Sequence, residues 1–201
     1  MRLRVIAAAF LVLAPAFVSL SVDAPLSGPP AAEASVSVLL SLDELVAASS
    51  SVVVGTPAEH KCQWEEIGGS KRIVTYTKIK VDKAIAGSPG SEVWVRTLGG
   101  VVDNLGQAVS GEAQLTQGSK AVLFLLKRGD VTMVTGMAQG HYPIKVDEKG
   151  ISRLKSSPDA GAQLRPPGPS ISARDVLVGQ PLDAAVTAIS KARKALDEKK
   201  K

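Results

Sequence analysis

The sequence contains few of the residues that build metal sites and disulfide frameworks. It has one cysteine, Cys62, and two histidines, His60 and His141, in 201 residues. A structural zinc site takes about four Cys or His ligands, and a disulfide scaffold needs paired thiols. Both are excluded for a monomer, and no cofactor or metal is expected. The Cys62 thiol is either free or bridged to another chain.

Aromatic residues are also scarce, at 3% of the chain. Five lie beyond the N-terminal segment: Trp64, Tyr76, Trp94, Phe124 and Tyr142. The core is therefore expected to be built from aliphatic side chains. Stacking surfaces for bases are few, so nucleic acid is not an expected partner.

The N-terminal segment has the layout of a secretory leader. Two arginines precede an uncharged apolar segment, 5–20, which is interrupted by a proline and is short for crossing a bilayer. Small residues allow cleavage after Ala34 or after Ala24. We therefore expect residues 1–34 to be a signal peptide and short spacer, with no transmembrane anchor after cleavage and a secreted or periplasmic product.

The net charge of +5 is concentrated at the C-terminal end. Residues 191–201 contain six basic and two acidic residues, so the body of the chain is nearly neutral. Such a basic tail either stays solvated or touches an anionic surface, where each basic residue gains up to about 1 kcal/mol.

A short helix is predicted after Ser41, because Ser41 and Glu44 form a capping-box pattern before an apolar stripe. At Val52 the apolar period changes to two. Alternate residues from Val52 through His60 and Cys62 would share one face if the strand continues past Pro57. A proline there indicates an edge, a bulge or a strand end.

The clearest strand spans 72–85, after a hairpin loop at Gly68-Gly69. Its length exceeds the usual five or six residues, so it is expected to bend and serve two layers, as in barrels. One dry face alternates with a charged face, which is typical of an antiparallel sheet. The predicted dry face consists of Ile73, Thr75, Thr77, Ile79, Val81 and Ile85.

Four more strands are predicted, at 92–98, 120–127, 131–137 and 142–146. The apolar part of the second is unbroken, which indicates a strand covered on both faces. Segment 99–118 has five glycines and no sustained period, so it is predicted to be a long connection and the first place to look for a binding loop.

The C-terminal part changes character after Lys155. Residues 156–179 are rich in Pro, Gly and Ser, which predicts a linker. The barrel domain before it is predicted to span 35–155. Residues 180–201 are predicted to form an amphipathic helix with a basic tail. This helix either packs on the barrel or stands free as an element that binds a partner.

The order of these elements resembles a known type of barrel. It includes the Val52-Val53-Val54-Gly55 strand, the strand ending in Ala86-Gly87 and the Gly118-x-x-Ala-Val-Leu-Phe-Leu pattern. Residues 40–147 are similar to the netrin/tissue-inhibitor-of-metalloproteinase type of OB barrel found in exported bacterial proteins. The resemblance implies a mainly β fold, with a five- to six-stranded antiparallel OB-like barrel, a short N-terminal helix and a C-terminal amphipathic helix.

The same resemblance does not imply protease inhibition. Those inhibitors present the amine and carbonyl of an N-terminal cysteine to the protease metal, and this chain has no such cysteine. The motifs of the common hydrolases and nucleotide-binding proteins are also absent.

Two functions remain open. The first is a non-enzymatic module that binds a protein or cell-envelope component, through segment 99–118 or the C-terminal helix. The second is a small extracytoplasmic hydrolase that uses His60, Cys62 or His141. Because His60 and Cys62 are about 6.5 to 7 Å apart along a strand, they cannot touch directly, and His141 would have to approach across the sheet.

Overall fold

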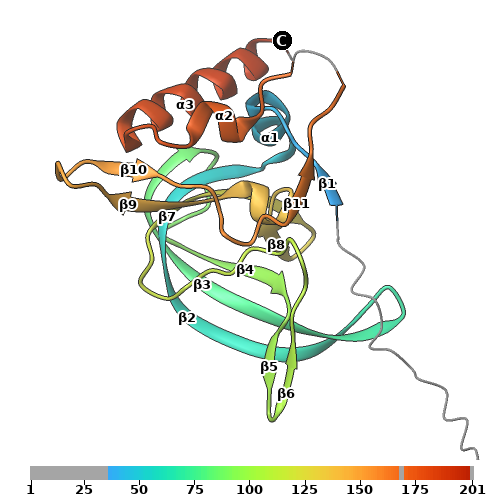
Figure 1. The fold of residues 1–201 in the computed structure, drawn as a ribbon. Helices are drawn as coiled ribbons and strands as arrows, with labels where there is room; N and C mark the ends of the chain where they lie inside the picture. The colour runs from blue at the N-terminus through green and yellow to red at the C-terminus, as the bar shows by residue number, and fades with distance from the viewer. Residues whose placement is uncertain (1–35, 168–169, 200–201) are drawn as a thin grey trace, which may run out of the picture. The chain divides into compact units, whose positions relative to one another are not determined.

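The computed structural model describes residues 36–167 and 170–199. The predicted leader, 1–34, and the last two lysines lie outside the described residues. Strands dominate the rest, and the predicted mainly β class is confirmed (Figure 1). In chain order the elements are β1 Val36–Val38, α1 Leu42–Ala48, β2 Ser51–Ile67, β3 Ser70–Ala86, β4 Glu92–Leu98, β5 Gly100–Val102, β6 Leu105–Gln107, β7 Ala121–Arg128, β8 Val131–Val134, η1 Met137–Gly140, β9 His141–Val146, β10 Ser152–Leu154, β11 Ala162–Leu164, α2 Ala173–Leu177 and α3 Leu182–Glu198.

Seven strands form the main sheet, in the order β10-β9-β7-β2-β3-β4-β8. The strand β8 also pairs with β7, so the pairings of β2, β3, β4, β8 and β7 make a closed circuit. All contacts in this circuit are antiparallel except β4–β8, which is parallel and consists of the single pair Arg96↔Met133. Two further sheets have two strands each, β1 with β11 and β5 with β6.

The helix α1 begins as the capping box predicts. The Ser41 hydroxyl accepts from the Glu44 N–H at 3.2 Å, and the Glu44 carboxylate accepts from the Ser41 N–H at 2.8 Å. Leu45 and Val46 are buried on its inner face. This end of the helix is therefore specified by local sequence.

The hairpin of β2 and β3 is longer and less regular than the sequence predicts. The strand β2 runs through Pro57, and the pairing slips at three places. At one of them Pro57 pairs with Ile79 and Glu59 with Lys78, so Ala58 is an extra residue in β2. A bulge of this kind rotates the strand and exchanges its faces.

The bulges correct two predicted faces. Val52 and Val54 pack in the core beneath the helices, whereas Val53 packs in a second core with Ile79. His60 pairs with Thr77, on the face of β3 that also carries Ile79, so His60 does not share a face with Val52. Two slips near the end of β3 likewise move Ile85 to the first core, away from the predicted dry face.

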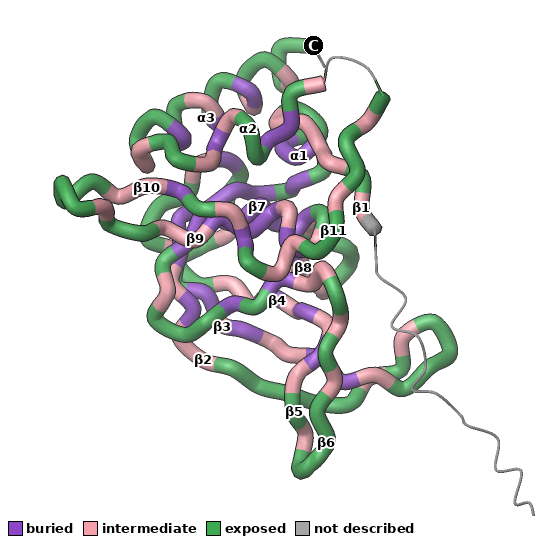
Figure 2. The backbone as a smooth tube through the Cα atoms, viewed as in Figure 1, coloured by how far each residue is buried: buried purple, intermediate pink, exposed green. Residues whose placement is uncertain are grey.

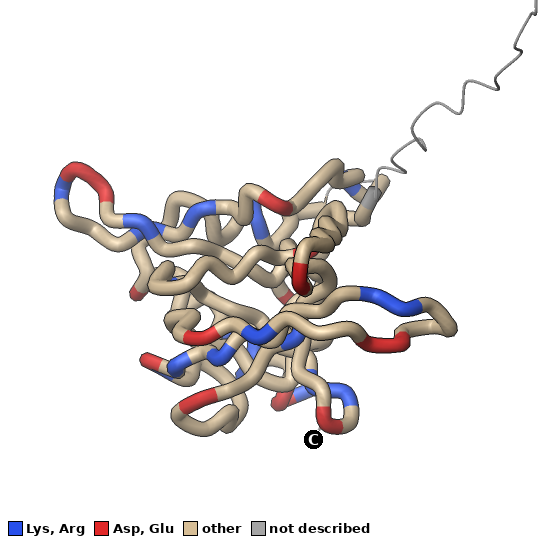
Figure 3. The backbone as a smooth tube through the Cα atoms, turned by 90° about the horizontal axis from the view of Figure 1, so that it is seen from below, with Lys and Arg blue, Asp and Glu red and all other residues tan. Residues whose placement is uncertain are grey.

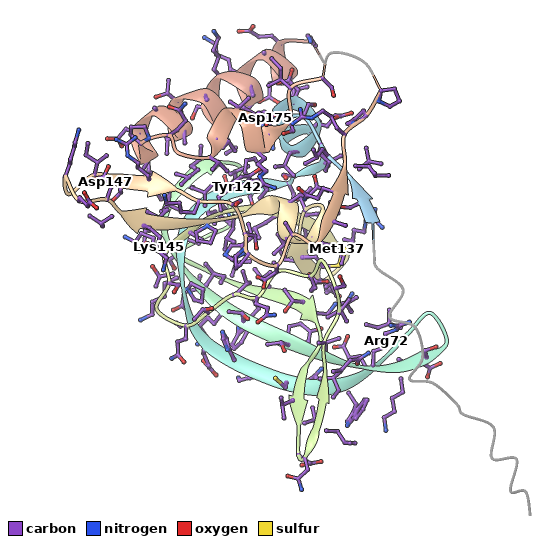
Figure 4. All side chains as sticks on the ribbon, in the orientation of Figure 1. Arg72, Met137, Tyr142, Lys145, Asp147 and Asp175 are labelled. Carbon is purple, nitrogen blue, oxygen red and sulfur yellow. The ribbon has the colours of Figure 1, made fainter. Side chains whose placement is uncertain are left out.

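The strand β7 separates the two cores, as its unbroken apolar sequence predicts. Val122 and Phe124 face the first core, and Leu123 and Leu125 face the second. All four side chains are fully buried, and β7 is the most buried strand in Figure 2. Phe124 meets Tyr142 of β9 edge to face, with ring centroids 5.9 Å apart, between the sheet and the helices (Figure 4).

Two segments differ from the prediction in their secondary structure. The connection 99–118 includes the hairpin of β5 and β6, which projects from the sheet in Figure 1. The predicted strand 131–137 is shorter, because β8 ends at Val134 and a 3-10 turn follows. That turn begins at Met137, which has a φ of 57° (Figure 4).

The Pro-rich segment 156–179 contributes two elements that the sequence analysis did not predict. The strand β11 pairs in parallel with β1, and the helix α2 buries Leu177 in the first core. Ser172 caps this helix and Asp175 completes its capping box (Figure 4). The pKa of Asp175 is held well below its usual range, mainly by the Arg165 guanidinium and to a smaller extent by the hydrogen bonds from Ser172.

The C-terminal helix α3 packs on the fold, and the three helices lie side by side in Figure 1. Ala185, Ile189 and Ala192 enter the first core. The Arg193 guanidinium donates to the carbonyls of Val46 at 3.0 Å and Ser49 at 2.7 Å, at the C-terminal end of α1. The Val46 carbonyl also accepts from the Ser49 N–H at 3.2 Å, and the guanidinium adds a charged donor at the end of the helix where carbonyls lack helical partners.

We expect Arg193→Met to destabilise the protein by about 2 kcal/mol, because the two carbonyls lose a charged donor while the aliphatic stem remains. Urea denaturation measures the difference. The matched control is the exposed neighbour Lys194→Met, which should change stability by less than about 0.5 kcal/mol. Equal effects from the two variants would show that Arg193 does not hold α1.

Candidate functional site

A cavity of about 630 Å³ opens on one face of the sheet. It lies between the second-core face of β2, β3 and β4 and the segment 97–117. Most of its lining residues come from this segment, which contains nearly all of 99–118, the connection that the sequence marks as the first place to look for a binding loop. The volume is in the range of small-molecule sites.

The floor of the cavity is polar because the strands change character past the Ala58 bulge. Cross-strand pairing places Thr77 beside His60, and Thr75 beside Thr97. All four side chains line the cavity. On the same face, Ile79 and Val95 continue into the second core. The cavity therefore extends the apolar interior and adds hydroxyl and imidazole groups on its floor.

Hydrogen bonds fix both ends of the overlying segment to the sheet. Near its start the Thr75 hydroxyl donates to the Gly99 carbonyl at 2.7 Å, and farther along, in β6, the Gln107 side-chain oxygen accepts from the Ile73 N–H at 2.7 Å. At the other end the Gln117 side-chain amide donates to the Ala58 carbonyl at 2.7 Å. The roof is thus tied to strands β2 and β3.

The middle of the roof is held by residues from outside the sheet. The Asp159 carboxylate accepts from the Gln114 N–H at 3.1 Å and from the Ser157 hydroxyl at 3.3 Å. The Gly111 carbonyl accepts from the Ala138 N–H at 2.9 Å. The segment 156–179 therefore helps to position the cavity.

Glu112 is the one acidic residue that lines the cavity. Burial raises the pKa of its carboxyl group, while the backbone amides of Leu98 and Ala113 and the charge of Arg96 oppose the rise. A carboxylate in this position is costly to keep ionised without a compensating partner.

The three reactive residues that the sequence offered are not brought together. His60 lines the large cavity, whereas His141 lines a separate small one of about 20 Å³. Cys62 is exposed and lines neither cavity, and its thiol lies 3.3 Å from the Thr75 hydroxyl. Within residues 36–167 and 170–199, no three His, Cys, Asp or Glu side chains are grouped closely enough to hold a metal ion.

His141 is buried, with 6% of its surface exposed. Its Nδ1 lies 3.2 Å from the Ser157 hydroxyl oxygen. Burial lowers the pKa of His141 from 6.5 to about 4, against an opposing effect of Asp159. At neutral pH this histidine is therefore uncharged and serves as a buried hydrogen-bonding group.

The opposite face of β2, β3 and β4 carries charges that are paired with one another. The ammonium groups of Lys61 and Lys78 lie 4.7 and 5.2 Å from the Trp94 ring centroid. The Glu59 carboxylate bridges both, at 3.2 and 2.9 Å. Basic and acidic positions are also interspersed over the described chain in Figure 3. This face offers little uncompensated charge.

Sequence reasoning missed Glu112 and the three cavity threonines. Thr75 and Thr77 belong to the predicted dry face of strand 72–85. Their hydroxyl groups among aliphatic side chains are a signal that part of this face does not pack in an apolar core. Glu112 has no comparable signal, because it lies in a loop whose path depends on contacts with β2, β3 and Asp159.

Among the described residues, no helix is long and apolar enough to cross a membrane. Comparison with protein-family models, curated proteins and solved structures found no match.

We expect Gly100→Ala to destabilise the protein by about 2 kcal/mol or more. Gly100 has a φ of 131°, and an added Cβ would collide with the Thr75 hydroxyl and lie 2.9 Å from the Cys62 sulfur. The control is Gly106→Ala in the same hairpin, where the nearest atom is 3.9 Å away. Thermal melting compares the two, and a neutral Gly100→Ala would mean that the hairpin lies farther from the sheet.

We expect His141 to make stability depend on pH. Between pH 6.5 and about 4 the unfolded chain binds a proton at His141 that the folded chain does not, so stability falls as pH is lowered. The loss between pH 7 and pH 5 should be about 2 kcal/mol. Urea denaturation at both pH values measures it, and His141→Gln should remove this part of the dependence. An unchanged pH dependence in that variant would contradict a buried, neutral His141.

Proposed function

We propose that this protein is an exported, non-enzymatic binding module that takes its ligand in the cavity beneath segment 97–117. The observation that supports the proposal most directly is the cavity itself, a hollow with both apolar and polar lining and a roof tied to the sheet by hydrogen bonds. Its floor presents hydroxyl and imidazole groups, and its roof presents amides and one carboxylate. Such a lining can recognise a ligand through hydrogen bonds.

We further propose that the domain is an OB-like barrel of the netrin/tissue-inhibitor-of-metalloproteinase type. The closed circuit of β2, β3, β4, β8 and β7 supports a five-stranded barrel. The capped helix before β2 and the packed C-terminal helix are consistent with the flanking helices of that arrangement.

Export and the class of partner are part of the same proposal. The leader-like residues 1–34 support a secreted or periplasmic location. A ligand there would be a protein or a component of the cell envelope, and the basic residues at 191–201 would be available to an anionic surface. Nucleic acid is not proposed as a ligand, since aromatic residues for stacking are few.

The alternative, a hydrolase based on His60, Cys62 or His141, receives less support from the geometry. A nucleophile and its base need to lie within hydrogen-bonding distance of each other. His60 and His141 line different cavities, and the Cys62 thiol lies beside the Thr75 hydroxyl. A thiol-reactive activity probe that labels Cys62, with loss of turnover in His60→Ala, would revive this alternative.

Site-specific photocrosslinking tests the proposed binding site. A photoreactive phenylalanine analogue at Gln114, on the exposed edge of the cavity, should give adducts in the cells that make the protein, detected by intact mass. The control position is Val146, which is 67% exposed on the β9–β10 hairpin and distant from the cavity lining. We expect at least about tenfold more adduct at Gln114, corresponding to a clear preference for the site.

Two results would contradict the proposal. Equal labelling at Gln114 and Val146 would indicate nonspecific contact. Labelling confined to a third position in the helix, Lys191, would place binding at the C-terminal end instead.

A further inference from the structure

The charged groups around the cavity are unevenly distributed. Among the described residues that line it, His60 and Glu112 are the two titratable side chains, and neither lysine nor arginine is present. The remaining polar side chains are threonines and glutamines. Glu112 is therefore the one lining residue that can carry a negative charge, and no lysine or arginine in the lining offsets it.

Glu112 has no cationic partner of its own in the described part of the chain, because no ammonium or guanidinium lies within 4.0 Å of it. Arg96 acts on it only through its charge. The Arg96 guanidinium is hydrogen-bonded to the Glu65 carboxylate at 3.0 Å, on the outer face of the sheet. Ionised Glu112 is thus partly buried, with the backbone amides of Leu98 and Ala113 as partners and no cation in contact with it among the described residues.

The other residues of the lining indicate which kind of ligand could pair with Glu112. Val101, Val109 and Leu115 supply apolar surface, and Thr75, Thr77 and Thr97 supply hydroxyl oxygens that can accept hydrogen bonds. An anion would meet the carboxylate without a compensating cation and would be repelled. A cation on an aliphatic stem matches both the carboxylate and the apolar lining.

We propose that the cavity binds an organic cation, a primary ammonium or guanidinium group on an aliphatic stem, with Glu112 as its ion-pair partner. This inference rests on the proposed binding function and names the chemical class of its ligand. The cation has two possible sources, a lysine or arginine side chain of a peptide and a free aliphatic amine. Glu112 would pair with the cationic group that both sources carry.

Titration of the ¹⁵N-labelled protein, in its naturally processed form, tests the proposal. The probes are the peptide acetyl-Gly-Lys-Gly-amide, the same peptide acetylated on the lysine Nζ, acetyl-Gly-Glu-Gly-amide, and free 1,5-diaminopentane. We expect the lysine peptide to shift amide resonances within 97–117 and to bind at least about tenfold more tightly than its acetylated form. Comparison with the free diamine separates the two sources.

Glu112→Gln should weaken binding of the lysine peptide by about tenfold or more, because the charge is removed while the shape is nearly kept. The control is Glu66→Gln, an exposed carboxylate that does not line the cavity, which should bind as the unaltered protein does. Thermal melting verifies that both variants fold. The pair of acetylated and free lysine peptides tests the charge requirement on the unaltered protein, even if Glu112→Gln does not fold.

Three results would overturn the inference, and they separate it from the proposed function. Equal binding of the free and acetylated peptides within 97–117, or preferred binding of the glutamate peptide, would reject the cation while keeping a cavity that binds. Full affinity in a folded Glu112→Gln would reject the role of Glu112. Absence of shifts with every probe would also reject the cation, and the photocrosslinking comparison at Gln114 and Val146 would then decide whether the cavity binds at all.

Discussion

The cavity depends on one irregularity in the long hairpin, the bulge that Ala58 makes in β2. Pro57 has no N–H to donate to the ladder, so the pairing is interrupted next to it. The bulge leaves two carbonyls free to accept hydrogen bonds from the C-terminal end of the roof and the residue after it. The Ala58 carbonyl accepts from the Gln117 side chain, and the Pro57 carbonyl accepts from the Gly118 N–H at 2.8 Å. The same irregularity therefore turns the strand and anchors the roof.

The bulge also explains why one hairpin can serve both an apolar core and a cavity with polar groups on its floor. Before it, Val53 lies in the second core; beyond it, His60 and Thr77 occupy the corresponding face. Buried β7 supplies the rigid wall between the two cores, and the helices close the first. A cavity built on such a framework keeps its shape because packed interiors deform little. Rigid elements are a good support for a binding site.

The sequence predicted the elements that local chemistry determines. The capping box at Ser41 located α1, alternation located β4 with the observed bounds 92–98, and the unbroken apolar run located β7 and its two buried faces. The helix α2 was not predicted, although Ser172 and Asp175 form the same kind of capping box. The prolines and glycines around it are typical of a linker, and a linker was predicted there.

The cavity was predicted only in outline. Segment 99–118 was predicted, from its glycines and lack of a sustained period, to be a long connection and the first place to look for a binding loop, and the structure places most of it against the cavity of about 630 Å³. The position of Glu112 and the exchange of faces at Ala58 depend on long-range hydrogen bonds and on register, which a single strand pattern does not determine. His60, Cys62 and His141 drew attention as scarce reactive residues, but the path of the sheet keeps them in different surroundings.

The most direct test of this account is the pattern of cross-strand nuclear Overhauser effects between β2 and β3. With Ala58 bulged out, His60 lies opposite Thr77, and the account predicts that effects join these two residues. A regular ladder continued from the Pro57↔Ile79 pair would instead place His60 opposite Tyr76. Effects that join His60 to Tyr76 and not to Thr77 would turn His60 away from the cavity and contradict the account.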